Sequence, residues 1–320
     1  PSLPVDVLAV DESVCLDRQL QRKAQELADA AVALGLQGAL QFCAYRDGVC
    51  IVDVCAGQLS TNSGAPTIDD QTLFPIFSTE KPLLATAVHR TVEQGKMSYD
   101  EPLKTWWPEF TGDGKENLTL RETLGYRSGM PGSGAQGLGH NAAELRMLGD
   151  WDRMTAWFAA TRPDIQPGTQ QRYMPISYAW ALGKPLENVW QKPLNEILRE
   201  QVLVPSGIAH DFYFAADDDA LARIATVYRS ETFETMNDEF CRRTCLPSAW
   251  AVSSAHGIAR FYNRLCGFDG LPPLIRKETL DAALEPCRRE GDPLPDAATL
   301  ARDWFMIFGM GYGLWGEADC

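Results

Sequence analysis

A serine and a lysine three residues apart are the first side chains in this sequence that could do covalent chemistry. Ser78 and Lys81 lie in Phe-Ser-Thr-Glu-Lys, directly after the apolar run Leu-Phe-Pro-Ile-Phe. If a helix begins at Ser78, residues three apart share a face, and the hydroxyl lies at the positive helix end. A serine becomes a nucleophile when a base takes its proton, and burial can lower a lysine pKa enough for that task. The spacing therefore predicts a nucleophile and its base, with a helix N-cap and a solvated lysine as the alternative.

The segments that surround this pair follow one another in a recognisable order. They are residues 72–82, 97–103, 107–110, 118–124, 127–131, 167–168, 173–183, 194–198, 204–208, 246–250 and 258–262. This order resembles the serine β-lactamase and penicillin-binding-protein superfamily. It is most similar to the class C β-lactamase-like branch, which includes esterases and fungal transesterases of the lovastatin acyltransferase type. The resemblance covers nearly the whole chain.

The resemblance implies a serine-dependent acyl-transfer enzyme. It gives Ser78 the role of nucleophile and Lys81 that of base, and Tyr173, which opens the second motif, shares the proton with them. The implied substrate is a small ester or thioester, for which an acyl carrier is one candidate donor, and no metal or cofactor is required. Tyr126 and Met174 lie next to the predicted site and are expected to line an apolar acyl pocket.

Three positions depart from the family pattern. Pro175 stands where the second motif often has Asn, which removes a side-chain amide and favours an ester or thioester over a β-lactam. Glu80 replaces a residue that is usually small or Thr, so it is expected to perturb the charge of Lys81. The printed chain ends at Cys320 before a Lys-Thr-Gly or His-x-Gly motif, so the last strands and one oxyanion donor are expected to be missing. One such donor is typically worth about 10²–10³ in rate.

These departures keep two other functions open. A β-lactamase or D-peptidase-like hydrolase would use the same serine, lysine and tyrosine. A non-catalytic binding protein on the same fold would need none of them as reacting groups.

The elements before the predicted nucleophile form a helix and a hairpin. Apolar residues recur at helical spacing over residues 13–34, with Ser13 as the expected N-cap and Gly35 as the stop. Two runs rich in apolar residues, 38–45 and 49–56, flank Arg-Asp-Gly and predict a β-hairpin. The helix is available to cover one face of that hairpin.

The elements after residue 78 are mainly helical. Helical patterns cover residues 79–94, 118–124, 142–148, 151–160, 178–189, 194–202, 251–265 and 277–284, and residues 309–315 begin a strand-containing segment. This order predicts an α+β fold: an antiparallel sheet flanked by helices, with a large helical insert and, on the resemblance, a β-lactamase/transpeptidase-like arrangement. The expected domains are a sheet domain of residues 1–77 and 247–320, and a helical domain of residues 78–246 that carries the nucleophile.

Composition excludes several classes of partner. The chain has 29 Lys and Arg against 43 Asp and Glu, a net charge of −14, which repels nucleic acid and anionic membrane surfaces. No apolar run approaches the ~18 residues of a membrane helix, and the first residues lack the pattern of a signal peptide, so a soluble cytoplasmic protein is expected. The nine cysteines are scattered and odd in number. This pattern favours reduced core thiols, and it argues against both a disulfide framework and a zinc site.

Overall fold

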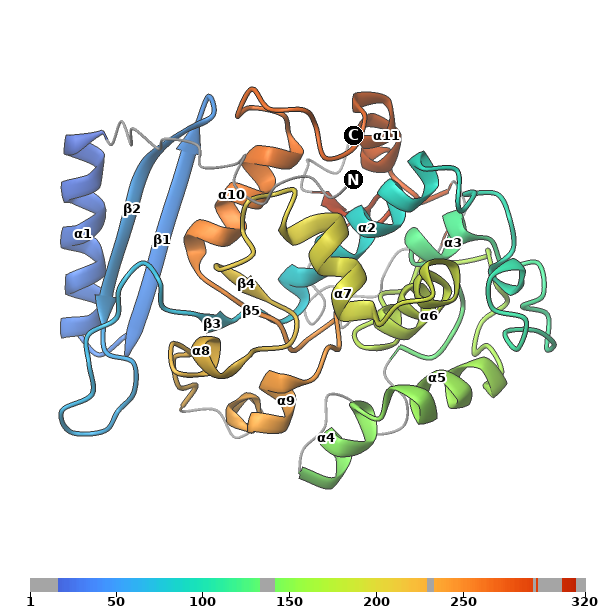
Figure 1. Cartoon of the computed structure of the whole chain (residues 1–320), viewed down its shortest axis with the longest axis horizontal. Helices are drawn as coiled ribbons and strands as arrows, with labels where there is room; N and C mark the ends of the chain where they lie inside the picture. Colours follow the sequence, from blue (N-terminus) through green and yellow to red (C-terminus); the bar gives the residue numbers. More distant parts are fainter. Residues whose placement is uncertain (1–16, 133–141, 229–232, 290–291, 293–306, 315–320) are drawn as a thin grey trace.

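The computed structural model describes residues 17–132, 142–228, 233–289, 292 and 307–314 (Figure 1). Over these residues many helices surround short antiparallel sheets, which confirms the predicted α+β class. No helix in these ranges combines the length and the apolar character that a membrane span requires.

The hairpin forms as the sequence predicts. Strands β1 (Ala39–Arg46) and β2 (Val49–Gly57) pair antiparallel. The turn between them consists of Asp47 at φ 52° and Gly48 at φ 85°. Two successive left-handed residues match the right-handed twist of the strands, and Asp-Gly is a preferred sequence for such a turn.

Helices cover both faces of this hairpin. Helix α1 (Arg18–Ala33) packs on one face through Ala28 against β2, and helix α10 (Ala255–Leu265) lies against β1 on the other (Figure 1). Helix α1 begins later than predicted, because the Asp17 carboxylate accepts the first free N–H groups of the helix. The expected cap, Ser13, lies outside the described residues. The predicted stop is confirmed: Gly35 follows the helix at φ 69°.

A second, three-stranded sheet leads to the candidate nucleophile. Its order is β3 (Phe74–Pro75), β5 (Val252–Ser253) and β4 (Phe212–Tyr213), all antiparallel. The expectation of a helix over residues 251–265 is wrong at its start. Residues 252 and 253 pair with strands on both sides, and Ser254 then caps α10 by accepting the N–H of Gly257.

The remaining elements of the described chain are helices and short helical turns. Helix α2 (Lys81–Glu93) packs against helix α6 (Ser177–Trp190) at the centre of the molecule. The other helices are α3 Leu120–Leu124, α4 Ala142–Leu148, α5 Trp151–Ala160, α7 Leu194–Leu198, α8 Asp218–Leu221, α9 Glu239–Arg243 and α11 Lys277–Leu284. Short helical turns are η1 Phe77–Glu80, η2 Leu103–Thr105, η3 Arg199–Leu203 and η4 Glu234–Asn237.

One core runs through the helical region and α10. It joins Leu83 of α2 and Trp180 of α6 to Phe261 of α10 and to Phe308. The core extends across the expected domain boundary at 247. The expected division into residues 1–77 with 247–320, and residues 78–246, remains a prediction.

The segment between β6 (Ile307–Phe308) and β7 (Gly313–Leu314) lies against α2. His89 is hydrogen-bonded through Nε2 to the Met310 carbonyl at 2.9 Å. Gly311 adopts φ 93°, and a Cβ built on it would lie 2.2 Å from the Cβ of Ala85. Only a residue without a side chain fits this approach. The expectation that further strands are missing concerns residues after Cys320 and remains a prediction.

Candidate active site

The backbone before Ser78 is held in an unusual conformation. After strand β3 ends at Pro75, the Ile76 N–H donates to the Ala251 carbonyl at 3.1 Å. Phe77 follows at φ 49°, in the left-handed region that a non-glycine residue seldom adopts. Its ring packs edge-on against Phe233, with 5.0 Å between centroids. Such strain persists where the surroundings enforce it, and it is concentrated at functional sites.

Ser78 lies in the η1 turn and α2 begins at Lys81, so the helix starts later than the sequence indicated. Ser78 is therefore not an N-cap. The turn nevertheless brings the two side chains together as the spacing predicted, with 2.9 Å between Lys81 Nζ and Ser78 Oγ.

Lys81 is buried, with 2% of its surface exposed. Besides Ser78, its ammonium donates to two main-chain carbonyls, that of Pro175 at 2.8 Å and that of Ser248 at 2.6 Å. The Ser78 hydroxyl also donates to the Ser248 carbonyl, at 3.4 Å. The three acceptors account for all three N–H bonds of a charged lysine.

Burial prepares this lysine to act as a base. Loss of solvation lowers the pKa of Lys81 to about 7, although the neighbouring Glu80 carboxylate opposes the shift. A neutral amine has two N–H bonds and one lone pair. If the carbonyls of Pro175 and Ser248 take the two N–H bonds, the lone pair faces Ser78 Oγ. The site can thus accept the serine proton near neutral pH.

Glu80, the residue before Lys81, is fully buried. Its Oε2 accepts the Ala251 N–H at 3.0 Å, and its Oε1 has no hydrogen-bond partner among the described residues. Burial raises the pKa of Glu80 well above its usual value. The carboxyl thus links the η1 turn to the segment before β5, the same segment that supplies the Ser248 carbonyl.

Tyr173 approaches the pair through its ring. Lys81 Nζ lies 5.1 Å from the ring centroid, within the range of a cation–π contact. The Tyr173 ring also stacks on the ring of Phe308, with a centroid distance of 5.5 Å. The structure therefore brings together all three side chains that the sequence placed in the catalytic group.

The two expected substrate-binding residues lie in the interior instead. Tyr126, at φ 60° and 2% exposed, packs between the rings of Tyr173 and Tyr178. Met174 is 1% exposed, and its sulfur accepts a hydrogen bond from the Ser128 hydroxyl at 3.2 Å. In this structure Tyr126 contacts Tyr173 and Met174 contacts Ser128, and the role of both in substrate binding remains a prediction.

The sequence did not reveal the two carbonyl acceptors. A main-chain oxygen carries no signature in residue type, so nothing marked Ser248. Pro175 did stand out as a departure from the family pattern. In the structure its carbonyl provides Lys81 with an acceptor that needs no amide side chain.

Comparison with sequence families and curated relatives gives a consistent result. The family model described as Beta-lactamase matches residues 20–316. The esterase/beta-lactamase LipL of Mycobacterium tuberculosis is 29% identical over 161 residues, which cover 50% of this chain and 35% of that protein. The chain spans about half or less of the length of the curated relatives that it matches.

Solved structures share the fold. A family VIII carboxylesterase superposes with a TM-score of 0.77 at 22% identity, covering 93% of this chain and 82% of the other. The simvastatin synthase of Aspergillus terreus, in a mutant form, superposes with a TM-score of 0.68 at 20% identity, covering 90% and 77%. These identities establish a common arrangement of helices and strands.

Proposed function

The chain belongs to the beta-lactamase family, and on that premise we propose that it is an esterase or transesterase working through an acyl-enzyme on Ser78. The observation that carries the proposal is the 2.9 Å contact between Ser78 Oγ and a buried lysine whose pKa is about 7. A hydroxyl beside a desolvated amine is the arrangement that activates a serine without a histidine.

In the proposed first step, neutral Lys81 accepts the Ser78 proton while Oγ attacks the carbonyl carbon of the ester. The tetrahedral intermediate then collapses, and the bond to the leaving alkoxide or thiolate breaks. Lys81 and Tyr173 share the proton and return it to that leaving group. Water or an acceptor alcohol next attacks the acyl-enzyme, losing its proton to the same pair, and Ser78 is regenerated.

The proposed acyl donor is a small ester or thioester, with an acyl carrier as one candidate source. Pro175 supports this choice, because its carbonyl holds Lys81 while its ring offers no amide to a β-lactam. Among the proteins compared, one carries esterase and β-lactamase together in its name, and another is a carboxylesterase. A β-lactamase or D-peptidase activity is the competing function for the same residues.

The test is the intact mass of the protein after brief incubation with p-nitrophenyl butyrate. We expect the wild type to gain one butyryl group and to release nitrophenol, and Ser78→Ala to do neither. Thr79→Ala is the matched control, because it removes an exposed hydroxyl from the same turn and should leave acylation unchanged.

Two outcomes would contradict the proposal. A folded wild type that binds ligand but gains no acyl group would indicate a non-catalytic binding protein. Faster turnover of a chromogenic cephalosporin than of simple esters, still dependent on Ser78, would indicate the β-lactamase function instead.

A further inference from the structure

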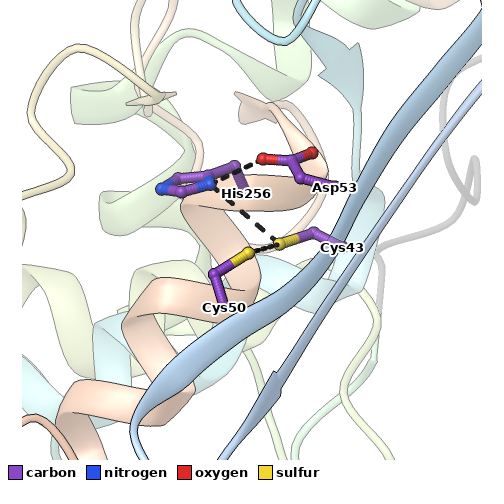
Figure 2. Close-up of side chains that lie close together, drawn as sticks. All are labelled: Cys43, Cys50, Asp53 and His256. Atoms are coloured by element: carbon purple, nitrogen blue, oxygen red, sulfur yellow. Dashed lines mark hydrogen bonds and ion pairs between the residues drawn. The ribbon is translucent and has the colours of Figure 1, made fainter. Parts of the chain in front are cut away.

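Four potential metal ligands meet between the hairpin and α10, apart from Ser78 and Lys81. Cys43 comes from β1, Cys50 and Asp53 from β2, and His256 from the first turn of α10. Figure 2 shows their side chains converging on one point. One ligand atom from each residue lies within 4.8 Å of all the others.

The distances are close to those of a tetrahedral zinc site. Cys43 Sγ and Cys50 Sγ are 3.8 Å apart. Zinc–sulfur bonds of about 2.3 Å at tetrahedral angles place two sulfurs about 3.8 Å apart. His256 Nδ1 lies 4.0 Å from Cys43 Sγ and 2.9 Å from Asp53 Oδ2. Tetrahedral bonds of about 2.0 Å to nitrogen and oxygen and about 2.3 Å to sulfur need about 3.3 Å between nitrogen and oxygen and about 3.5 Å between nitrogen and sulfur. The nitrogen–oxygen pair must therefore open, and the nitrogen–sulfur pair must close, by about half an ångström or less.

An irregularity in the hairpin is what places the two β2 residues on one face. Residues three apart in a regular strand point to opposite faces. Here the register shifts between Ala44 and Tyr45, so that Cys43 is opposite Asp53 while Tyr45 is opposite Cys50. The extra residue of this β-bulge turns Cys50 to the side of Asp53. That side faces α10 and not α1.

The position of α10 relative to the hairpin is also fixed. The Gln41 side chain of β1 accepts the N–H of Ala255 at 2.9 Å and donates to the Thr72 carbonyl at 3.0 Å. Tyr45 Oη lies 3.4 Å from Nε2, the ring nitrogen of His256 that does not face the cluster. An outer partner of this kind orients a ligating imidazole.

Charge and exposure fit a bound dication. Two thiolates, one carboxylate and a neutral imidazole around Zn²⁺ leave a net charge of −1, which the positive N-terminus of α10 favours. The side chains of His256 and Asp53 are 16% and 24% exposed, so an ion can enter, whereas Cys50 is buried.

We propose that Cys43, Cys50, Asp53 and His256 bind one zinc ion that fastens the hairpin to α10. Thiolate and imidazole ligands select zinc over magnesium or calcium. Four protein ligands leave no open position, so the site is structural and takes no part in acyl transfer. The proposal is independent of the function of Ser78.

Zinc content tests it directly. The full chain is loaded with zinc, desalted and measured by inductively coupled plasma mass spectrometry. We expect one zinc per wild-type chain and a tenfold or larger loss in Cys43→Ser/Cys50→Ser. Cys55→Ser is the matched control, because this β2 thiol contacts the Ile68 carbonyl instead of the cluster and its loss should leave one zinc.

Cobalt reports on the ligands themselves. Co²⁺ loaded into the wild type should give a thiolate charge-transfer band in the near ultraviolet and the intense visible bands of a tetrahedral ion. The charge-transfer band should vanish in the double variant, and Asp53→Asn should weaken binding by about 10–100-fold, as loss of one ligand or its support does.

The proposal is overturned if the loaded wild type carries no zinc, or if the double variant retains it. It is also overturned if intact mass under non-reducing conditions shows a Cys43–Cys50 disulfide, lighter by two hydrogens, that forms in preference to the metal site.

Discussion

The molecule contains two polar clusters that are assembled in different ways. Ser78 and Lys81 are three residues apart, and the fold completes their environment with carbonyl oxygens from Pro175 and Ser248. The cluster at Cys43 draws all its groups from side chains, and His256 is 213 residues away from Cys43. The first cluster is thus visible in a sequence motif, whereas the second exists only after the strands pair.

The two clusters also use burial differently. At Lys81, exclusion of water lowers the pKa of the amine to about 7, so that a neutral amine able to accept a proton is present near pH 7. At Cys43 the exposed edge of the cluster leaves a path for an ion. Variants of each should therefore change different properties of the protein.

The largest effect is expected for Lys81→Met, which keeps the length of the side chain and removes the amine. General-base catalysis is typically worth about 10²–10⁴ in rate, so acylation by p-nitrophenyl butyrate should fall by that factor. Stopped-flow release of nitrophenol measures it. Lys104→Met, at an exposed lysine, should retain the wild-type rate. An unchanged rate in Lys81→Met would remove Lys81 from the mechanism.

Tyr173→Phe should have the next largest effect. The ring and its contacts with Lys81 and Phe308 remain, and only the hydroxyl is lost. We expect turnover to fall by about 10²-fold, at the lower end of proton-transfer contributions, with KM little changed. Tyr262→Phe, at a tyrosine 37% exposed, is the control. Equal loss in both variants would indicate a structural effect.

The cluster at Cys43 should affect stability and leave chemistry intact. Zinc at about 100 times its Kd stabilises the folded state by about 2.7 kcal/mol. Chelation of the loaded wild type should therefore lower Tm by several degrees, and Cys43→Ser/Cys50→Ser should show no such response. The acylation rate should stay within about threefold of the wild type, because the cluster lies outside the reacting group. A large loss of acylation with unchanged Tm in the double variant would contradict the prediction that this cluster affects stability and not acyl transfer.

The smallest effect is expected on pH dependence. Only neutral Lys81 can accept a proton, so the acylation rate should rise with pH through a midpoint near the pKa of about 7. The Glu80 carboxylate raises that pKa, so Glu80→Gln should move the midpoint to lower pH while an amide oxygen keeps the hydrogen bond from Ala251. Glu101→Gln, on the surface, should leave the midpoint unchanged. A midpoint that moves upward would contradict this role.

Local patterns were sufficient for much of the fold. The hairpin, its Asp-Gly turn and the stop at Gly35 depend on residues close in sequence, and the structure confirms them. The start of α10 was misjudged because residues 252 and 253 become a strand only through pairing with β3 and β4. Propensity cannot show a partner that lies far away along the chain.

The features of the candidate site also separate into those set by residues close in sequence and those set by distant residues. Helical spacing was enough to bring Ser78 and Lys81 together. The depth of Tyr126 and Met174 was not predictable, because adjacency to a motif does not indicate which way a side chain points. The meeting of Cys50 with Cys43 and Asp53 depended on a β-bulge, and a single shift of register reverses every side chain in a strand.

The close approach of Gly311 to Ala85 restricts side-chain size at two positions that are far apart in the sequence. A Cβ at position 311 would collide with the Cβ of Ala85, so a side chain fits there only if the backbone shifts or residue 85 loses its own Cβ. Ala85 lies one helical turn after Lys81, so a larger residue at position 311 would displace the helix that carries the proposed base. In a mutant library that is varied around Gly311 and selected for activity, variants that displace Lys81 should therefore be lost.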